Sequence, residues 1–232
     1  GRDVTFLVRK ARAEKLAAEG LQVRSPVGDY QIDAPQTVTA DALAGAGPFD
    51  LVLLSCKAYD LDTALADVAP AVGPQTAVLP ILNGMNHLDA LDRKFGAERV
   101  LGGSCAIVGT MTKTGEIRQM TDLHSLTYGE RDGSRSERLQ AIEALMEGVR
   151  FQARSSDQVV LEMWEKWVFL ATLAGSTTLM LATNRDIAAA TGGKAFAEAQ
   201  PDECPAVAVA AGYGPPETDF ARARKPRTTH GA

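Results

Sequence analysis

One lysine in this chain lies within a strongly apolar segment that is expected to be helical. Lys166 follows Met163 by three residues and precedes Phe169 and Leu170 by three and four, and residues at these offsets share one face of a helix. Apolar surroundings lower the pKa of a lysine, because its charged form loses hydration. A lysine with a lowered pKa can act as a general acid, so Lys166 is a candidate catalytic residue.

A simpler interpretation of this lysine is that it forms a surface ion pair. Glu162 lies four residues before Lys166, and a glutamate followed by a lysine at this spacing is an ordinary pair on the exposed face of a helix. The helical segment alone leaves both interpretations open. Polar residues elsewhere in the chain favour the catalytic interpretation.

Three of these polar residues, Arg9, Lys57 and Asn83, each follow a short apolar run that is typical of a buried strand. Because ligands bind beyond the carboxyl ends of the strands in open parallel sheets, the three side chains are expected to gather at one edge of a sheet. In a dinucleotide-binding fold, an acidic residue after the second strand holds the ribose hydroxyls, whereas an arginine accommodates a 2′-phosphate. Arg9 therefore predicts NADP rather than NAD as the cofactor.

Each of these residues also has a plainer interpretation. Arg9 could belong with Lys10 and Arg12 to the solvated start of a helix. Asn83 and Gly84 form a dipeptide that is common in ordinary turns. The proposed ligand site depends on the three positions occurring together.

The elements that must position these residues alternate between strand and helix in the first part of the chain. The patterns predict strands at 4–8, 49–56, 76–82, 100–112, 116–128 and 149–153, a hairpin at 21–32, and helices at 11–19, 60–68, 87–95 and 136–148. After residue 155 the strand patterns stop. Asp157 is a candidate N-cap for a long helix that runs to about Ala182, and another helix is expected from about Lys194. This order predicts an α/β fold with a doubly wound parallel sheet, followed by a mostly helical domain.

Composition excludes several classes of protein. The 232 residues are 45% hydrophobic and 23% charged, and their net charge of -5 argues against nucleic acid as a partner. The three cysteines and three histidines are widely spaced, so we expect neither a metal site nor a disulfide framework, and a reducing cytoplasm fits best. The most apolar stretch, residues 167–182, contains polar residues and is too short for a membrane span.

One expected motif is missing from the sequence. A Rossmann unit begins with a strand, a Gly-x-Gly-x-x-Gly turn and a helix, but no such fingerprint occurs, and Gly102-Gly103 has the wrong spacing. The opening residues Gly1-Arg2-Asp3 resemble the exit from a first helix into a second strand. We therefore expect the first strand, its glycine turn and the first helix to lie outside these 232 residues.

Five short segments occur in a characteristic order and spacing. They are Val4–Arg9, Leu53–Asp60, Leu82–Met85, Val100–Gly103 and Trp164–Lys166. Together they resemble the ketopantoate reductases (2-dehydropantoate 2-reductases), and the resemblance covers about residues 1 to 215. It implies a Rossmann domain followed by a helical domain, with the active site in the cleft between them. It also implies that hydride passes from NADPH to the ketone of ketopantoate, which gives pantoate for pantothenate and coenzyme A synthesis.

The resemblance assigns a role to each candidate residue. Arg9 would bind the 2′-phosphate, Lys57 and Asn83 would contact the cofactor, and Asn83 would also lie near the substrate. Lys166 would contact the substrate and protonate the developing alkoxide. The corresponding domains are an NADP-binding domain at 1–155, a helical substrate domain at 156–220, both incomplete, and a disordered tail at 221–232. The partner implied is a small 2-oxoacid, without nucleic acid or membrane, and a homodimer is compatible with the resemblance.

The sequence departs from the family after the lysine. Family members often carry Asn four and eight residues beyond it, where this chain has Leu170 and Ala174. The substrate could therefore be another 2-oxoacid, as in related hydroxyacid or opine dehydrogenases. A third alternative is a non-catalytic remnant, because we expect a chain without the glycine turn and the later helices to bind NADPH poorly and to turn over little or no ketopantoate.

Overall fold

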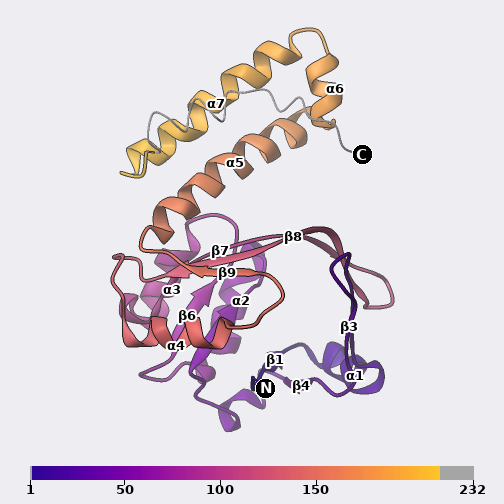
Figure 1. Ribbon diagram of the computed structural model, residues 1–232, viewed down its shortest axis with the longest axis vertical. Helices are drawn as coiled ribbons and strands as arrows, with labels where there is room; N and C mark the ends of the chain where they lie inside the picture. The colour runs from indigo at the N-terminus through magenta and orange to yellow at the C-terminus, as the bar shows by residue number, and fades with distance from the viewer. Residues whose placement is uncertain (1, 215–232) are drawn as a thin grey trace. The chain divides into compact units, whose positions relative to one another are not determined.

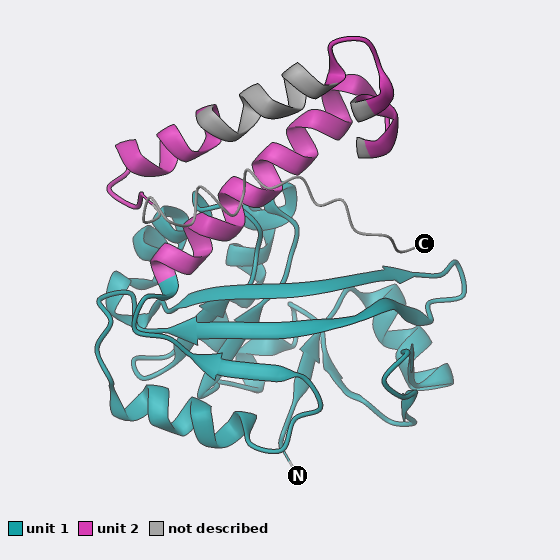
Figure 2. Ribbon diagram, turned by 45° about the horizontal axis from the view of Figure 1, so that its top comes forward, with its two compact units in different colours: residues 1–159 teal, residues 160–232 magenta. Residues whose placement is uncertain are grey.

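The computed structural model describes residues 2–214, except for the side chains of residues 184, 188 and 194–202 (Figure 1). The chain divides into two compact units, residues 1–159 and residues 160–232, coloured teal and magenta in Figure 2. The tail predicted at 221–232 lies outside the described residues.

The first unit contains strands and helices in the predicted order. They are β1 Thr5–Leu7, α1 Lys10–Glu19, β2 Leu21–Arg24, β3 Tyr30–Ile32, β4 Gln36–Val38, β5 Leu51–Leu54, α2 Leu61–Val68, β6 Ala77–Pro80, α3 His87–Phe95, β7 Gly102–Met111, β8 Ile117–Gly129, α4 Glu137–Met146 and β9 Gln152–Ser155. Two helices end at glycines with positive φ, Gly20 after α1 and Gly96 after α3, as expected for residues that terminate helices without a Cβ penalty. The short strand β4 was not predicted, because it lacks an apolar run.

The strand ends at which ligand-binding side chains were expected belong to two pairs of parallel strands. β5 and β6 are joined through α2 and pair in parallel, with Leu54 opposite Pro80. β1 pairs in parallel with β4, with Leu7 opposite Val38. All four residues of β6 are buried, as expected for a strand covered on both faces.

A five-stranded sheet completes the first unit, and it is mixed rather than wholly parallel. β7 and β8 form a long antiparallel hairpin (Figure 2). Along its other edge β8 pairs in parallel with β2, through Val23 opposite Ile117, and with β9, through Ser125 opposite Gln152. The expectation of one parallel sheet is wrong in two respects. The described strands form three sheets, and β7 and β8 pair antiparallel, as two long strands joined by a short turn must.

The core of the first unit lies between the inner strands and α4. Its buried residues come from β6, from the segments around β7 and β8, and from α4; they are Ala77, Leu79, Leu101, Leu126, Tyr128, Leu139 and Ile142. The α4 residues are spaced by three positions, so they lie on one face of that helix. This packing holds β6, and with it the strand end that precedes Asn83, in a fixed place.

The Gly102-Gly103 pair has a structural role at the start of β7. A Cβ atom on Gly103 would lie 2.2 Å from the carbonyl oxygen of Pro80 in β6, which is far inside a van der Waals contact. The absence of a side chain lets the two strands approach closely. This close approach, rather than phosphate binding, is the role that the structure gives this glycine.

A buried ion pair anchors α4 to the end of β8. Glu130 is 7% exposed, and its carboxylate accepts two hydrogen bonds from the Arg138 guanidinium, one of them at 2.7 Å, and another from the Ser136 hydroxyl. Ser136 is also the N-cap of α4, since its side chain accepts a hydrogen bond from the backbone N–H of Leu139. The hydrogen bonds from Arg138 lower the pKa of Glu130. The carboxylate therefore stays charged although it is buried.

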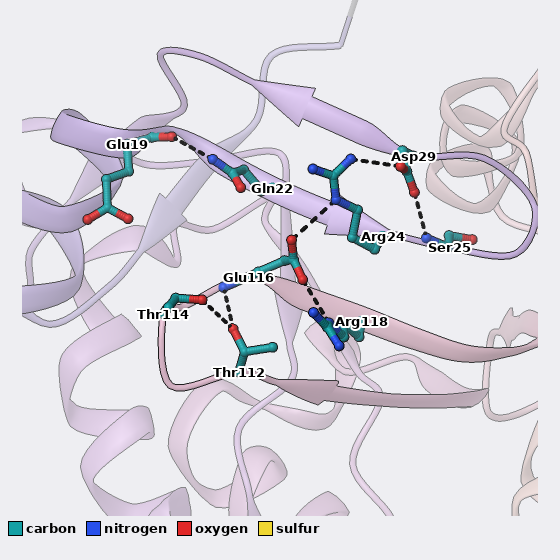
Figure 3. Close-up of polar contacts among 9 residues, drawn as sticks. All are labelled: Glu19, Gln22, Arg24, Ser25, Asp29, Thr112, Thr114, Glu116 and Arg118. Carbon is teal, nitrogen blue, oxygen red and sulfur yellow. Dashed lines mark hydrogen bonds and ion pairs between the residues drawn. The ribbon is translucent and has the colours of Figure 1, made fainter.

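The tip of the β7–β8 hairpin is held by charged side chains (Figure 3). Glu116 accepts hydrogen bonds from Arg24 at 3.2 Å and from Arg118 at 2.7 Å. Arg12 of α1 donates to the backbone carbonyl of Gly115 at 3.2 Å. These contacts join the hairpin to β2 and α1, which lie about a hundred residues earlier in the chain.

The described residues of the second unit form helices joined by short non-helical segments. α5 spans Val159–Met180, with its first residue still in unit 1, and is followed by α6 Asn184–Ala189 and α7 Gly193–Ala210. Because α5 begins at Val159, Asp157 is not at its N-cap position as predicted. Trp164 of α5 stacks on Tyr213 with ring centroids 6.0 Å apart, which fixes the end of α7 against α5. Among the described residues no helix is long and apolar enough to cross a membrane.

Candidate functional site

Lys57 and Asn83 occupy equivalent places at the ends of paired strands. Leu54 of β5 lies opposite Pro80 of β6, and Lys57 and Asn83 each come three residues after one of these partners. The backbone N–H of Ile81 donates a hydrogen bond to the Leu54 carbonyl at 2.9 Å. The two segments are therefore still paired at the point where the strands end. Both side chains are exposed. The structure thus places an ammonium and an amide at the same edge of the same pair of strands.

Local backbone geometry sets the direction of both segments. Lys57 is extended, with φ −78° and ψ 151°, and its carbonyl accepts a hydrogen bond from the backbone N–H of Asp60 at 2.9 Å, which starts a short 3-10 turn at Ala58–Asp60. Gly84 has a φ of 94°, a conformation that glycine adopts without strain. The chain bends at Asn83 and Gly84, and Asn83 is exposed shortly before α3.

Arg9 lies at the N-terminal end of α1. It is the N-cap residue, and its carbonyl accepts hydrogen bonds from the backbone of Arg12 and Ala13. Its side chain is 83% exposed, and Nη2 lies 3.7 Å from Oδ1 of Asp60. The first turn of α1 carries no acidic residue. An exposed guanidinium at a helix N-terminus suits an anionic group such as a phosphate.

The ion pair between Arg9 and Asp60 also brings together the segments that follow two different strands. Arg9 follows β1, and Asp60 ends the turn that Lys57 opens after β5. Arg9 therefore lies beside the end of the Lys57 segment, although β1 and β5 belong to different sheets rather than to one sheet edge as predicted. Asp60 itself was not recognised as a site residue, because an aspartate before a helix is an ordinary feature and only the three-dimensional arrangement brings it to Arg9.

Two neighbours of these residues are less suited to bind a ligand. Arg12 was predicted to add positive charge beside Arg9, but its guanidinium is hydrogen-bonded to the hairpin tip at Gly115. Cys56 precedes Lys57, and burial raises the pKa of its thiol. The thiol therefore remains protonated near neutral pH and is a poor nucleophile.

Lys166 lies in the second unit, on α5, and its side chain is half-buried. Met163, three residues earlier, is 4% exposed, whereas Phe169, three residues later, is 52% exposed. The apolar surroundings predicted for the lysine are thus present on the preceding turn and incomplete on the following one. Leu170 and Ala174 lie one and two turns beyond Lys166, on its side of the helix.

A buried histidine stands at the start of α3, directly after the Asn83 turn. His87 is 4% exposed, and its Nε2 has no hydrogen-bond partner among the described residues. Burial lowers the pKa of His87 to about 4. The folded protein therefore keeps this imidazole neutral at pH values at which an unfolded chain would protonate it.

This shift predicts a loss of stability in weak acid. Below pH 6.5 the unfolded chain takes up a proton at His87 that the folded chain refuses until about pH 4, so falling pH favours unfolding. We expect roughly 2–3 kcal/mol to be lost over this interval. Urea unfolding at several pH values measures this effect. As the pH falls, the variant His87→Leu should lose clearly less free energy of unfolding than the unchanged protein.

The matched control for this effect is the partly exposed His124. Burial lowers its pKa as well, but the ring retains more contact with water, so His124→Gln should change the pH dependence less than His87→Leu. Equal pH dependence in the His87 variant and the unchanged protein would show that this residue is not the source of the acid sensitivity.

No group of three or more His, Cys, Asp or Glu side chains within the described part of the chain is placed to hold a metal ion. The candidate residues offer a guanidinium, two ammonium groups and an amide, which are groups that bind anions and polar ligands.

Comparison with known families places this chain. Residues 1–133 match the model of the ketopantoate reductase PanE/ApbA family, and residues 158–230 match the model of its C-terminal part. The chain belongs to the ketopantoate reductase family. The resemblance inferred from the five sequence segments is thereby confirmed.

Curated relatives of the chain are oxidoreductases of related description. The uncharacterised oxidoreductase YkpB of Bacillus subtilis is 37% identical over 179 residues, which are 77% of this chain and 58% of YkpB. A 2-dehydropantoate 2-reductase of Mesorhizobium japonicum is 27% identical over 201 residues, which are 75% of this chain and 60% of that enzyme. The chain thus spans about three fifths of the length of either relative.

Solved structures agree on the fold. The 2-dehydropantoate 2-reductase of Geobacter metallireducens superposes with a TM-score of 0.84 at 24% identity, over 100% of this chain and 78% of that structure. A D-mandelate dehydrogenase in complex with NADH and anilino(oxo)acetate gives a TM-score of 0.80 at 18% identity, over 97% of this chain and 72% of that structure. The predicted fold class, a Rossmann-like α/β domain followed by helices, is confirmed.

Proposed function

We propose that the full gene product containing this chain reduces a 2-oxoacid with NADPH, and that the substrate is ketopantoate. The observation that carries this proposal is the family match over residues 1–133 and 158–230. The product would be pantoate, which is used for pantothenate and coenzyme A synthesis. The spread of three cysteines along the chain fits a reducing cytoplasm for such an enzyme.

The cofactor would be held at the strand ends of residues 1–155. Arg9, exposed at the N-terminus of α1, suits the 2′-phosphate. Lys57 and Asn83, three residues beyond the paired ends of β5 and β6, suit the remaining polar groups of the dinucleotide. All three placements fit a dinucleotide, because ligands of parallel sheets bind beyond the carboxyl ends of the strands, and Arg9 supports NADP, because an arginine at this place accommodates a 2′-phosphate.

Lys166 would complete the reaction from the helical domain, which we assign to residues 156–220. NADPH supplies hydride to the ketone carbon, so negative charge develops on the ketone oxygen. An ammonium placed there stabilises this charge and donates the proton that yields the hydroxyl group. The half-buried position of Lys166 on α5 supports this role, because partial exclusion of water strengthens its interaction with the developing charge.

The proposal is tested by following the loss of NADPH absorbance with the purified full gene product and a panel of 2-oxoacids. We expect ketopantoate to give the highest kcat/KM. Oxidation of NADPH with other 2-oxoacids but not with ketopantoate would overturn the substrate assignment, and no oxidation with any of them would overturn the activity.

A second candidate function is supported by Leu170 and Ala174. Both lie on the side of α5 that carries Lys166, and neither can hydrogen-bond a substrate through its side chain. A site built in this way favours a less polar 2-oxoacid, as in a hydroxyacid or opine dehydrogenase. The panel separates the two functions, since this alternative predicts a higher kcat/KM for 2-oxoacids with apolar side chains than for ketopantoate.

Cofactor choice provides a further test of Arg9. The unchanged protein should prefer NADPH to NADH, and Arg9→Asp should reduce this preference by about 1.5–3 kcal/mol, the range for a hydrogen bond to a charged group. The preference is measured as the ratio of kcat/KM values for the two cofactors.

Lys15→Asp is the control for this substitution. It makes the same change in charge on α1, at a lysine that pairs with Glu19 at 2.8 Å, and it should leave the ratio unchanged. Equal efficiencies for NADPH and NADH in the unchanged protein would refute the role of Arg9.

A further inference from the structure

The ion pair between Arg9 and Asp60 places a carboxylate beside the proposed phosphate-binding arginine. Oδ1 of Asp60 lies 3.7 Å from Nη2 of Arg9, and the two side chains are 43% and 83% exposed. Asp60 immediately precedes α2, at the end of the turn that Lys57 opens. Both side chains can reach a ligand from water, and they carry opposite charges.

We infer that Asp60 is a specificity-determining residue, which competes with the 2′-phosphate of the cofactor for Arg9. A guanidinium that holds a carboxylate must release or share it before it can hold a phosphate. Asp60 therefore lowers the preference for a 2′-phosphorylated nucleotide that Arg9 provides. This inference rests on the proposed function, in which Arg9 binds the 2′-phosphate.

The geometry limits the size of the effect. A separation of 3.7 Å between exposed groups corresponds to a weak ion pair. The competition should therefore change affinity by about two- to fivefold, which does not exceed the range measured for exposed pairs. The competition acts only on a ligand that needs Arg9. A nucleotide without a 2′-phosphate should bind equally well whether Asp60 carries a charge or not.

The experiment measures binding by calorimetry, without turnover, in the full gene product. The probes are adenosine 2′,5′-bisphosphate, which carries the 2′-phosphate, and adenosine 5′-monophosphate, which lacks it. Asp60→Asn should strengthen binding of the bisphosphate by about two- to fivefold and leave binding of the monophosphate unchanged. Asp62→Asn, which removes an exposed carboxylate two residues later in the first turn of α2, should leave both affinities unchanged.

A double-mutant cycle shows whether Asp60 acts through the arginine. In an Arg9→Gln background, Asp60→Asn should no longer strengthen binding of the bisphosphate. The inference is overturned if the gain persists in that background or if Asp62→Asn produces the same gain. It is also overturned if Asp60→Asn weakens binding of the bisphosphate, because that result would mean that Asp60 orients Arg9. If the unchanged protein does not bind the bisphosphate more tightly than the monophosphate, the proposed role of Arg9 fails as well. If it does, and Asp60→Asn changes neither affinity, only the role of Asp60 fails.

Discussion

Replacing Lys166 by methionine should lower kcat of the full gene product by about 10²–10⁴, while NADPH affinity and the free energy of unfolding stay close to those of the unchanged protein. Methionine keeps an unbranched apolar side chain beside Met163 but cannot donate a proton. The ketone oxygen would then develop its negative charge without an ammonium group. Steady-state turnover, NADPH titration and urea unfolding measure the three quantities separately.

The competing interpretation of Lys166 makes a different prediction. If the lysine only pairs with Glu162 on the surface of α5, the substitution should cost about 0.2–0.5 kcal/mol of stability and leave kcat nearly normal. Lys113→Met, at an exposed lysine in the β7–β8 turn, provides the same chemical change away from the proposed site and should spare turnover. A normal kcat in the Lys166 variant would therefore exclude it as the general acid.

Replacing Arg138 by methionine should lower the free energy of unfolding at neutral pH by about 3–4 kcal/mol, the lower part of the range for breaking a buried ion pair. The side chain of Glu130 is 9% exposed and that of Arg138 is 29% exposed, so the variant leaves a nearly buried carboxylate that still accepts a hydrogen bond from the Ser136 hydroxyl. Urea unfolding of the chain measures the loss.

The pH dependence distinguishes lost charge pairing from lost packing. Arg138 holds the pKa of Glu130 below its ordinary value of 4.5, so the pair stabilises the protein above that pH and this contribution is lost as the pH falls through the lowered pKa. In the variant the carboxylate can take up a proton more readily. The difference in stability between the two proteins should therefore shrink in acid.

Arg135→Met is the matched control for this substitution. Arg135 precedes α4 and pairs with Glu143 at 3.0 Å, but its side chain is 68% exposed. An exposed pair contributes no more than about 1 kcal/mol. A similar loss from both substitutions, or a loss at Arg138 that does not change with pH, would refute the buried charge as its cause.

The amino-acid sequence by itself determined the elements that depend on neighbouring residues. α3 spans His87–Phe95, as predicted, because its apolar spacing and the following Gly96 act within a few residues of one another. The hairpin of β2 and β3 and the long strands on either side of Gly115 follow from turn residues between strand-forming runs. The five family segments are also local patterns, so the sequence alone was enough to recognise the family.

Strand pairing between distant segments was decided only by the tertiary structure. β2 pairs with β8 through Val23 and Ile117, and β1 pairs with the unpredicted β4. Any exposed strand edge can pair with several others, and the choice depends on which apolar faces are buried together. The sequence therefore predicted the strands other than β4, but it did not predict the mixed sheet that several of them form.

The candidate site shows the same difference between what local patterns predict and what tertiary contacts decide. Arg9, Lys57 and Asn83 could be named from the sequence, because each follows a strand. The sequence did not show that β1 pairs with β4, in a different sheet from the β5–β6 pair that precedes Lys57 and Asn83. Asp60 could not, since its interaction with Arg9 joins two segments that are separated by about fifty residues and depends on a distance of 3.7 Å between two side-chain atoms. Residue type and spacing indicate which groups can bind a ligand, whereas the packed strands decide which charges lie beside them.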